Sequence, residues 1–330
     1  MFELAVATHA MLLVVDLDDH LQLHRRQVLA TGHHYGIALE TEGAPGFLAK
    51  HDDRLLTRYR RQPDNGVWAA DGQLAFRQPV DYVHQIARAN GGLYITNTTH
   101  NSLVFQDDAG DIWHEHHFGG RRDEDINHVN SVFPCGSLVL ALLHNHNREP
   151  SQAVLFEHSP ATGFKVRETI GLAHFGCHNV FVDDQHLFYN ASAAGKWVII
   201  PKATPTAVRE LVFDGHAKGM SVTERYVVIG LSAHAPRPER VSSPGSVLVI
   251  DRQDHDHIAT VDLNQDGPIG NVNEIRCLSH RDYAHAGRQS DLHDLRSFRL
   301  RRESIMRRYL RLVSNKLRTL PHPQPSPTRQ

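Results

Sequence analysis

The fold is decided by a repeated stretch of sequence whose clearest copy reads VHQI at residues 83–86 and GLYITN at residues 92–97. A short strand with a polar opening residue leads through a Gly-containing turn into a second strand that ends in Asn. The pattern returns as HVNSV (128–132) before LVLALLHN (138–145), as CHNV (177–180) before LFYN (187–190), and as KGMSV (218–222) before YVVIGLS (226–232).

The spacing of these copies is typical of a β-propeller. The equivalent residues are His84, Asn130, His178 and Met220. They are separated by 46, 48 and 42 residues, which is the range of blades built from four strands. Two weaker copies, YGIAL at 35–39 and NEI at 273–275, bring the number to six. Since a single blade cannot bury both faces of its sheet, the sequence predicts an all-β fold, a six-bladed β-propeller over residues 1–280.

The closure of the ring is also predicted. Residues 2–29 read as three strands that lack an opening strand of their own, whereas the copy at 271–278 is an opening strand with nothing after it. We expect this C-terminal strand to pair with the N-terminal blade, because such pairing removes the open edges of the sheet.

The pattern beyond residue 280 differs from that of the propeller. Residues 281–320 read as a helical extension whose apolar stripe begins near residue 292, and the Pro-rich tail 321–330 is predicted to be disordered. Between residues 296 and 318 there are nine Lys or Arg and one Glu. Three alternatives stay open for this basic helix at 292–320: docking on its own acidic propeller, on an anionic membrane surface, or on a protein or nucleic-acid partner.

Composition narrows the class of protein. The net charge of −2 gives no general basicity, so no specific nucleic-acid partner is predicted. Three cysteines without CxxC pairing fit reduced thiols, and neither a signal peptide nor a membrane span is visible, so we expect a cytoplasmic protein. The unusual number is 26 His, and histidine is the commonest metal ligand.

Propeller geometry gives a positional argument for the site. The first strand of each blade runs along the central channel and the second returns antiparallel, so the start of the first and the end of the second lie at the same mouth. Polar residues gather at these two places, whereas the intervening residues are mostly aliphatic. A polar site on a rigid apolar scaffold is typical of ligand binding.

The main hypothesis is a divalent metal ion held by imidazoles at this mouth. The predicted ligands are His84, His128 and His178, while His144 and Glu274 are further candidates as ligands or catalytic groups. The alternative is that these residues satisfy backbone groups around a wet channel, where the inner edge of the first strand has no partner strand.

Other residues at the mouth are predicted to hold a substrate. Lys218 is a candidate anion-binding residue or, if burial lowers its pKa, a general base. Arg237 and Arg240 lie in an insertion that overhangs the mouth and could clamp an acidic group. The remaining predicted substrate-binding residues are Asn97, Asn130, Asn190 and Ser232.

These motifs resemble bacterial six-bladed propellers of the broad NHL/SMP-30-like type. The resemblance rests on the copies beginning at His84, His178 and Lys218 and covers residues 1–280. It implies the architecture, within a group that includes metal-dependent lactonases, lyases and plain binding scaffolds. Lactonases of this type use Glu, Asn and Asp around a divalent ion, and only Asn130, Asn190 and Glu274 could take such parts here.

The sequence therefore favours a small-molecule-binding propeller that is a metal-assisted enzyme of the hydrolase, lyase or isomerase type. The expected substrate is polar and anionic or carbohydrate-like. The alternative is a non-catalytic ligand- or protein-binding module whose basic helix docks on a partner or membrane surface.

Overall fold

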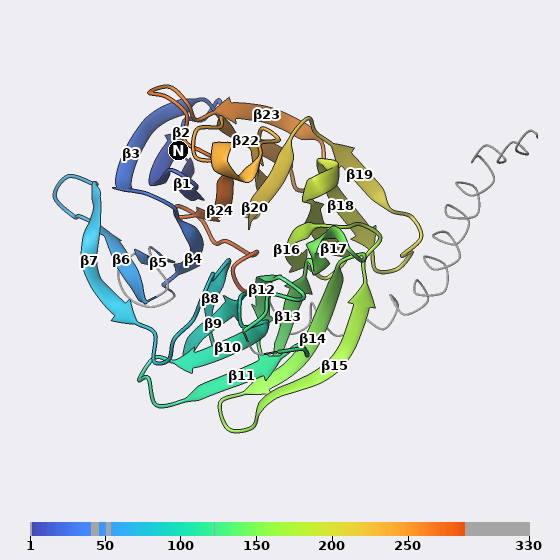
Figure 1. Cartoon of the computed structure of the whole chain (residues 1–330). Coiled ribbons are helices and arrows are strands. Elements are labelled where there is room, and N and C mark those ends of the chain that lie inside the picture. The colour runs from blue at the N-terminus through green and yellow to red at the C-terminus, as the bar shows by residue number, and fades with distance from the viewer. Residues whose placement is uncertain (1, 41–45, 51–53, 122, 288–330) are drawn as a thin grey trace, which may run out of the picture.

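The computed structural model describes residues 2–40, 46–50, 54–121 and 123–287, which form a ring of six four-stranded antiparallel sheets (Figure 1). Named from the innermost strand outward, blade one is β24 (Val272–Cys277), β1 (Phe2–Thr8), β2 (Met11–Leu17) and β3 (Leu23–Thr31), and blade two is β4 (Tyr35–Leu39), β5 (Gly46–Lys50), β6 (Leu55–Arg61) and β7 (Trp68–Ala75). Blade three is β8 (Ile86–Ala89), β9 (Gly92–Asn97), β10 (Ser102–Asp107) and β11 (Trp113–His117), and blade four is β12 (Val129–Cys135), β13 (Leu138–Leu143), β14 (Gln152–Ser159) and β15 (Gly163–Gly171).

Blade five is β16 (Cys177–Val182), β17 (His186–Ala191), β18 (Lys196–Pro201) and β19 (Arg209–Val212), and blade six is β20 (His216–Val222), β21 (Tyr226–Ser232), β22 (Gly245–Asp251) and β23 (His257–Asp262). Three short 3₁₀ turns lie in the connections: η1 (Asn145–Asn147), η2 (Ser192–Ala194) and η3 (Arg237–Glu239). The innermost strands contact one another in ring order, from β24 through β4, β8, β12, β16 and β20 back to β24. The predicted six-bladed propeller is thereby confirmed.

The blades pack face to face, which explains the composition of their strands. A central strand such as β13 is almost entirely aliphatic and buried, because both of its faces contact neighbouring blades. Outer strands such as β23 are mostly exposed and carry polar residues. The core is therefore a set of apolar layers between blades, with polar residues on the outer strands and at the channel.

The ring closes as predicted. β24 pairs with β1 in antiparallel register, with Leu4 opposite Cys277 and Val6 opposite Ile275. The last strand thus supplies the inner strand that the N-terminal blade lacks, and it covers the inner edge of β1.

Most of the innermost strands carry a β-bulge close to one mouth of the channel. The strand register skips Gly36, Asn130, Asn179 and Asn273, and one extra residue lies at Lys218-Gly219. Gly219 has φ +79°, and a Cβ there would lie 3.1 Å from the backbone of Glu274, so only glycine fits this close approach. The first paired residue after the bulge is Met220 in blade six and Val180 in blade five. Lys218, rather than Met220, is therefore the equivalent of His178.

The opposite mouth is closed by the segment that follows β24. Residues 278–287 cross the base of the ring (Figure 1) and bond to several blades. Tyr283 N donates to Val222 O at 2.6 Å, and Gly287 N donates to Pro134 O at 2.9 Å. The predicted helix at 292–320 and the Pro-rich tail 321–330 lie outside the described residues. In the part that is described, no helix is long and apolar enough to cross a membrane.

Candidate functional site

Aromatic side chains form a continuous arc around the mouth that lies away from residues 278–287. Successive ring centroids are 4.5–5.7 Å apart along the series His33, Tyr35, His84, His128, His144, His178 and His216, which we call the imidazole arc. All except His144 lie at or just before the start of an innermost strand, and His144 directly follows a second strand. The structure thus brings His84, His128 and His178 to one mouth, while their role as metal ligands stays a prediction.

Burial keeps the imidazoles of the arc neutral. It lowers the pKa of His84 and of His178 well below the usual value, and neighbouring cationic or imidazole groups add to the effect. The pKa values of His144 and His216 fall to about 3 for the same first reason. The arc therefore offers neutral ring nitrogens, which can coordinate a metal or accept a hydrogen bond.

His84 and His178 have ring nitrogens that are not used by other described residues of the protein. His84 is 5% exposed, and within the described residues neither ring nitrogen has a hydrogen-bond partner. Ser192 Oγ donates to Ala217 O, so it accepts from His178 Nδ1 at 2.9 Å, and this leaves the lone pair of His178 on Nε2. Both side chains therefore have ring nitrogens available for a ligand.

Lys218 lies near both ends of the arc, over the Tyr35 ring and two residues along β20 from His216. Its Nζ lies 4.8 Å from the centroid of the Tyr35 ring and donates to Asn273 Oδ1 at 3.3 Å. Burial, followed by the nearby cation of Arg240, lowers the pKa of Lys218 to about 7. This amine is therefore divided between its charged and neutral forms near neutral pH.

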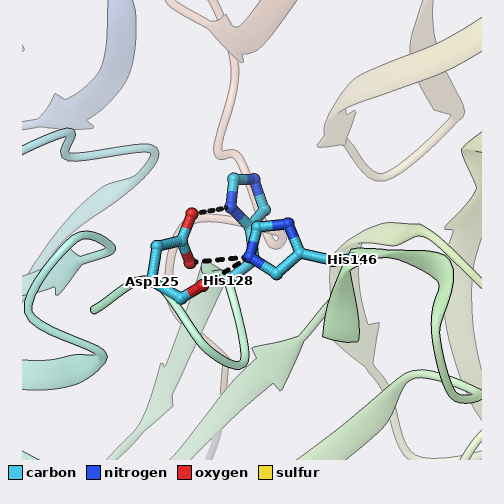
Figure 2. A group of neighbouring side chains, drawn as sticks. All are labelled: Asp125, His128 and His146. Carbon is cyan, nitrogen blue, oxygen red and sulfur yellow. Dashed lines mark hydrogen bonds and ion pairs between the residues drawn. The ribbon is translucent and has the colours of Figure 1, made fainter. Parts of the chain in front are cut away.

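One group at the mouth has the spacing of a metal site. Asp125, His128 and His146 place one ligand atom each within 4.8 Å of the others, and they are the only such group in the described ranges. Figure 2 shows the carboxylate of Asp125 facing both rings, 2.7 Å from His128 Nδ1 and 3.1 Å from His146 Nε2. The same His146 nitrogen lies 2.7 Å from the backbone oxygen of Asp125. Two imidazoles and a carboxylate suit Zn²⁺ or another divalent transition metal and leave positions open.

Sequence reasoning found His128 but missed Asp125 and His146. Asp125 precedes β12 by four residues, and His146 lies in η1, where three successive residues have φ between 49° and 59°. This left-handed run turns His146 back towards blade four's entry loop. The sequence signals that could have found the group are the Asp-x-x-His spacing at 125–128 and the His-x-His spacing at 144–146.

The predicted substrate-binding amides and hydroxyl have partners within the scaffold. Asn97 Oδ1 accepts from Asp81 N, Asn130 Nδ2 donates to Cys177 O, and Ser232 Oγ accepts from Val272 N, at 2.8–2.9 Å. Asn190 Nδ2 lies 3.3 Å from Gly219 O. These bonds tie neighbouring strands and blades together, and any contact of these side chains with substrate stays a prediction.

Glu274 is the centre of a buried polar network below the arc. Its Oε2 accepts from Gln85 Nε2 at 2.6 Å, and its Oε1 lies 3.2 Å from Arg276 Nη1. Burial raises the pKa of Glu274, while Arg276 opposes that rise. Both oxygens are thus engaged within the protein, and a catalytic part for this carboxyl is untested.

The insertion of blade six crosses the mouth, as expected. Arg237 in η3 donates to the hydroxyl of Tyr82 at 3.1 Å, although Tyr82 belongs to the lead-in of blade three on the far side of the ring. Beside this crossing lies a cavity of about 260 Å³. It is lined by His216, His234, Ala235, Pro236, Arg240 and Asn271.

Comparisons with known proteins support the fold. No family model matches the chain. No curated protein matches it either. Among solved structures, it is similar to a chain of a nidogen–laminin complex (TM-score 0.58, 9% identity, covering 84% of this chain and 98% of that one). It is also similar to a Bacteroides caccae protein of unknown function (TM-score 0.58, 12% identity, covering 84% of this chain and 99% of that one). A third similar structure is the periplasmic gluconolactonase of Pseudomonas aeruginosa (TM-score 0.54, 12% identity, covering 85% of this chain and 99% of that one). At such identities the likeness shows the propeller fold alone.

Proposed function

We propose that the protein is an enzyme that uses a divalent metal ion to act on a small, polar, anionic substrate at the channel mouth, by hydrolase or lyase chemistry. The observation that carries this proposal is the Asp125, His128 and His146 group, which lies at the middle of the imidazole arc, where His128 is a member of both. The likeness to a gluconolactonase is compatible with it but adds only the shared fold.

The chemistry follows from the residues at the mouth. A metal ion held by Asp125, His128 and His146 would polarise a substrate oxygen or lower the pKa of a water molecule. Lys218, with a pKa of about 7, holds an anionic group when charged and accepts a proton when neutral. His178 Nε2 carries a lone pair and can accept a hydrogen bond from the substrate, but burial holds its pKa well below the usual value, so it takes up no proton near neutral pH.

The test is the metal content of the freshly purified full-length protein. We expect about one divalent ion per chain in the wild type and a loss of at least tenfold in affinity in Asp125→Asn and His146→Gln. The matched control is His257→Gln, which removes an exposed imidazole from the outer strand β23. Less than about a tenth of an ion per chain, with no binding of added Zn²⁺ or Mn²⁺, would exclude the metal.

The second candidate is a non-catalytic binding module. It is favoured by the direct 2.7 Å bond between Asp125 Oδ2 and His128 Nδ1, which pairs these two atoms without an ion. A module predicts that the melting temperature is the same before and after chelation, whereas a metal enzyme predicts a fall.

We also propose a cytoplasmic location, supported by Cys135, Cys177 and Cys277, which are all buried. The residues 292–320 are proposed to dock on a protein or membrane surface, on the strength of their charge alone. Fractionation of cells that produce the full chain, with and without these residues, tests both statements.

A further inference from the structure

Positive charge at the mouth is not balanced by carboxylates. Lys218, Arg237 and Arg240 form no ion pair with any described carboxylate, although most described arginines elsewhere do, including the fully buried Arg276. Lys218 is only 9% exposed. Glu274 attracts the Lys218 ammonium but forms no ion pair with it. Because a buried cation without a paired carboxylate is unfavourable, this imbalance indicates that an anion belongs at the mouth.

The cavity beside the insertion is built around one of these cations. The backbone of Arg240 is fixed, since its carbonyl accepts from Asn271 N at 2.8 Å. Its Nε donates to Ala235 O at 3.3 Å, which anchors the side chain. The two terminal nitrogens of the guanidinium form no hydrogen bond to any described residue. A guanidinium held in this way presents a planar fork of donors that fits two oxygens of an anion.

The cavity also adjoins the imidazole arc. His216 lines the cavity, and its ring centroid is 5.7 Å from that of His178. His234 also lines the cavity, and its ring centroid is 6.3 Å from that of His216. A ligand group bound beside Arg240 would therefore extend towards the ring nitrogens where the proposed chemistry takes place.

We propose that this cavity binds the oxyanion group, carboxylate or phosphate, of the protein's small-molecule ligand, with Arg240 as the main donor and Lys218 as the neighbouring cation. This names a substrate class for the proposed function and rests on it for catalysis. The binding itself does not depend on the metal and is tested separately.

The site couples anion binding to a proton. The groups that interact with Lys218 are Arg240, Glu274, Asn273, Tyr35 and the imidazoles of His9, His33, His84, His128, His144, His178 and His216. A bound anion stabilises the charged amine and raises its pKa above the value of about 7 in the ligand-free protein. Anion affinity is therefore highest below that pH, and above it binding takes up a proton and weakens as pH rises.

The experiment is calorimetric titration of the full-length protein with inorganic phosphate and, in a second arm, with acetate, at matched ionic strength. We expect binding in at least one arm and a loss of about tenfold or more in Arg240→Met. The matched control is Arg167→Met, which removes an exposed outer-strand arginine paired with Glu157. Lys218→Met is the second variant; it replaces the amine by an apolar chain of similar length and is expected to weaken binding as well.

The pattern of results decides the proposal. Binding in the phosphate arm alone assigns a phosphorylated ligand, and binding in the acetate arm alone assigns a carboxylic acid. No binding in either arm, equal affinity in Arg240→Met, or an equal loss in Arg167→Met would overturn the site. Sulfate, whose charge is constant between about pH 6 and pH 9, checks the coupling, because its affinity must fall across that interval. Asp125→Asn separates the two proposals, since it should lose metal and keep anion binding.

Discussion

Replacing Arg276 by leucine should destabilise the propeller more than the same exchange at any other arginine in the described residues. Its guanidinium is fully buried and holds three blades together. Nη1 donates to Met220 O at 2.7 Å, Nε donates to Ile37 O at 3.2 Å, and the ion pair with Glu274 measures 3.2 Å. Removing one partner of a buried pair leaves an uncompensated charge and costs about 3–5 kcal/mol.

The effect should depend on pH with a defined sign. The pKa values of Glu274 and Asp282 are raised by burial, and Arg276 opposes both rises, so Arg276→Leu raises them further. A carboxyl whose folded-state pKa exceeds its unfolded value stabilises the fold at low pH and loses that contribution as pH rises through the folded-state value. The destabilisation by Arg276→Leu should therefore be larger at pH 8 than at pH 5.

Urea denaturation at the two pH values measures both quantities. The control is Arg209→Leu, which breaks an exposed pair with Asp256 and should change the free energy of unfolding by about 0–1 kcal/mol. The double variant Arg276→Leu, Glu274→Gln should recover part of the loss, because it removes the unpaired charge. A loss below about 1 kcal/mol in Arg276→Leu, or an equal loss at both pH values, would refute the reasoning.

Three further predictions follow from the mouth and the inner strands. Asp125→Asn should abolish the stabilisation of the protein by added Zn²⁺, seen as a melting temperature that no longer rises with the metal; an unchanged rise would contradict the proposed ligand. Gly219→Ala should lower the free energy of unfolding by about 1–3 kcal/mol, since the residue has φ +79° and a crowded Cβ position. Gly171→Ala, at a position with neither a positive φ nor an atom within 4 Å of the added Cβ, should cost less; equal losses would contradict the argument. Lys218→Met should be more stable than the wild type by up to about 5 kcal/mol below pH 7, because the folded-state pKa of the amine is depressed. In denaturation curves this difference in stability should shrink towards pH 10, and a difference that does not change with pH would contradict the lowered pKa of Lys218.

The architecture was predictable because its signals are local and repeated. Strands such as β9 and β13 show their turns and aliphatic runs directly, and the spacing of the copies sets the number of blades. The pairing of β24 with β1 was predictable from the number of strands: the N-terminal blade has only three strands of its own, and the last strand has no further strands after it to form a blade.

The finer details depend on features that periodicity does not carry. The bulge at Lys218-Gly219 corresponds to the one at Asn179, so Lys218 is the equivalent of His178 and lies two places before Met220, on which the sequence copies align; a bulge leaves no mark in a pattern of period two. Asp125 and His146 lie in irregular connections, so their meeting is set by the left-handed turn around η1 and by tertiary packing. The sequence of residues 278–287 shows only that the strand pattern ends. Their path across the base is set by hydrogen bonds to the blades, which the local sequence does not reveal.

The course of the chain at the ring's seam has a consequence for how the protein matures. β24 and the base-crossing residues 278–287 come last in the described chain, yet they complete the first blade and the floor of the channel. During synthesis, five blades can assemble while the N-terminal sheet waits, one strand short, for a segment about 270 residues away. Joining ends that far apart requires about 3 kcal/mol more loop-closure free energy than joining a ten-residue hairpin. The seam should therefore be the last junction to form after release from the ribosome and the first to open under strain.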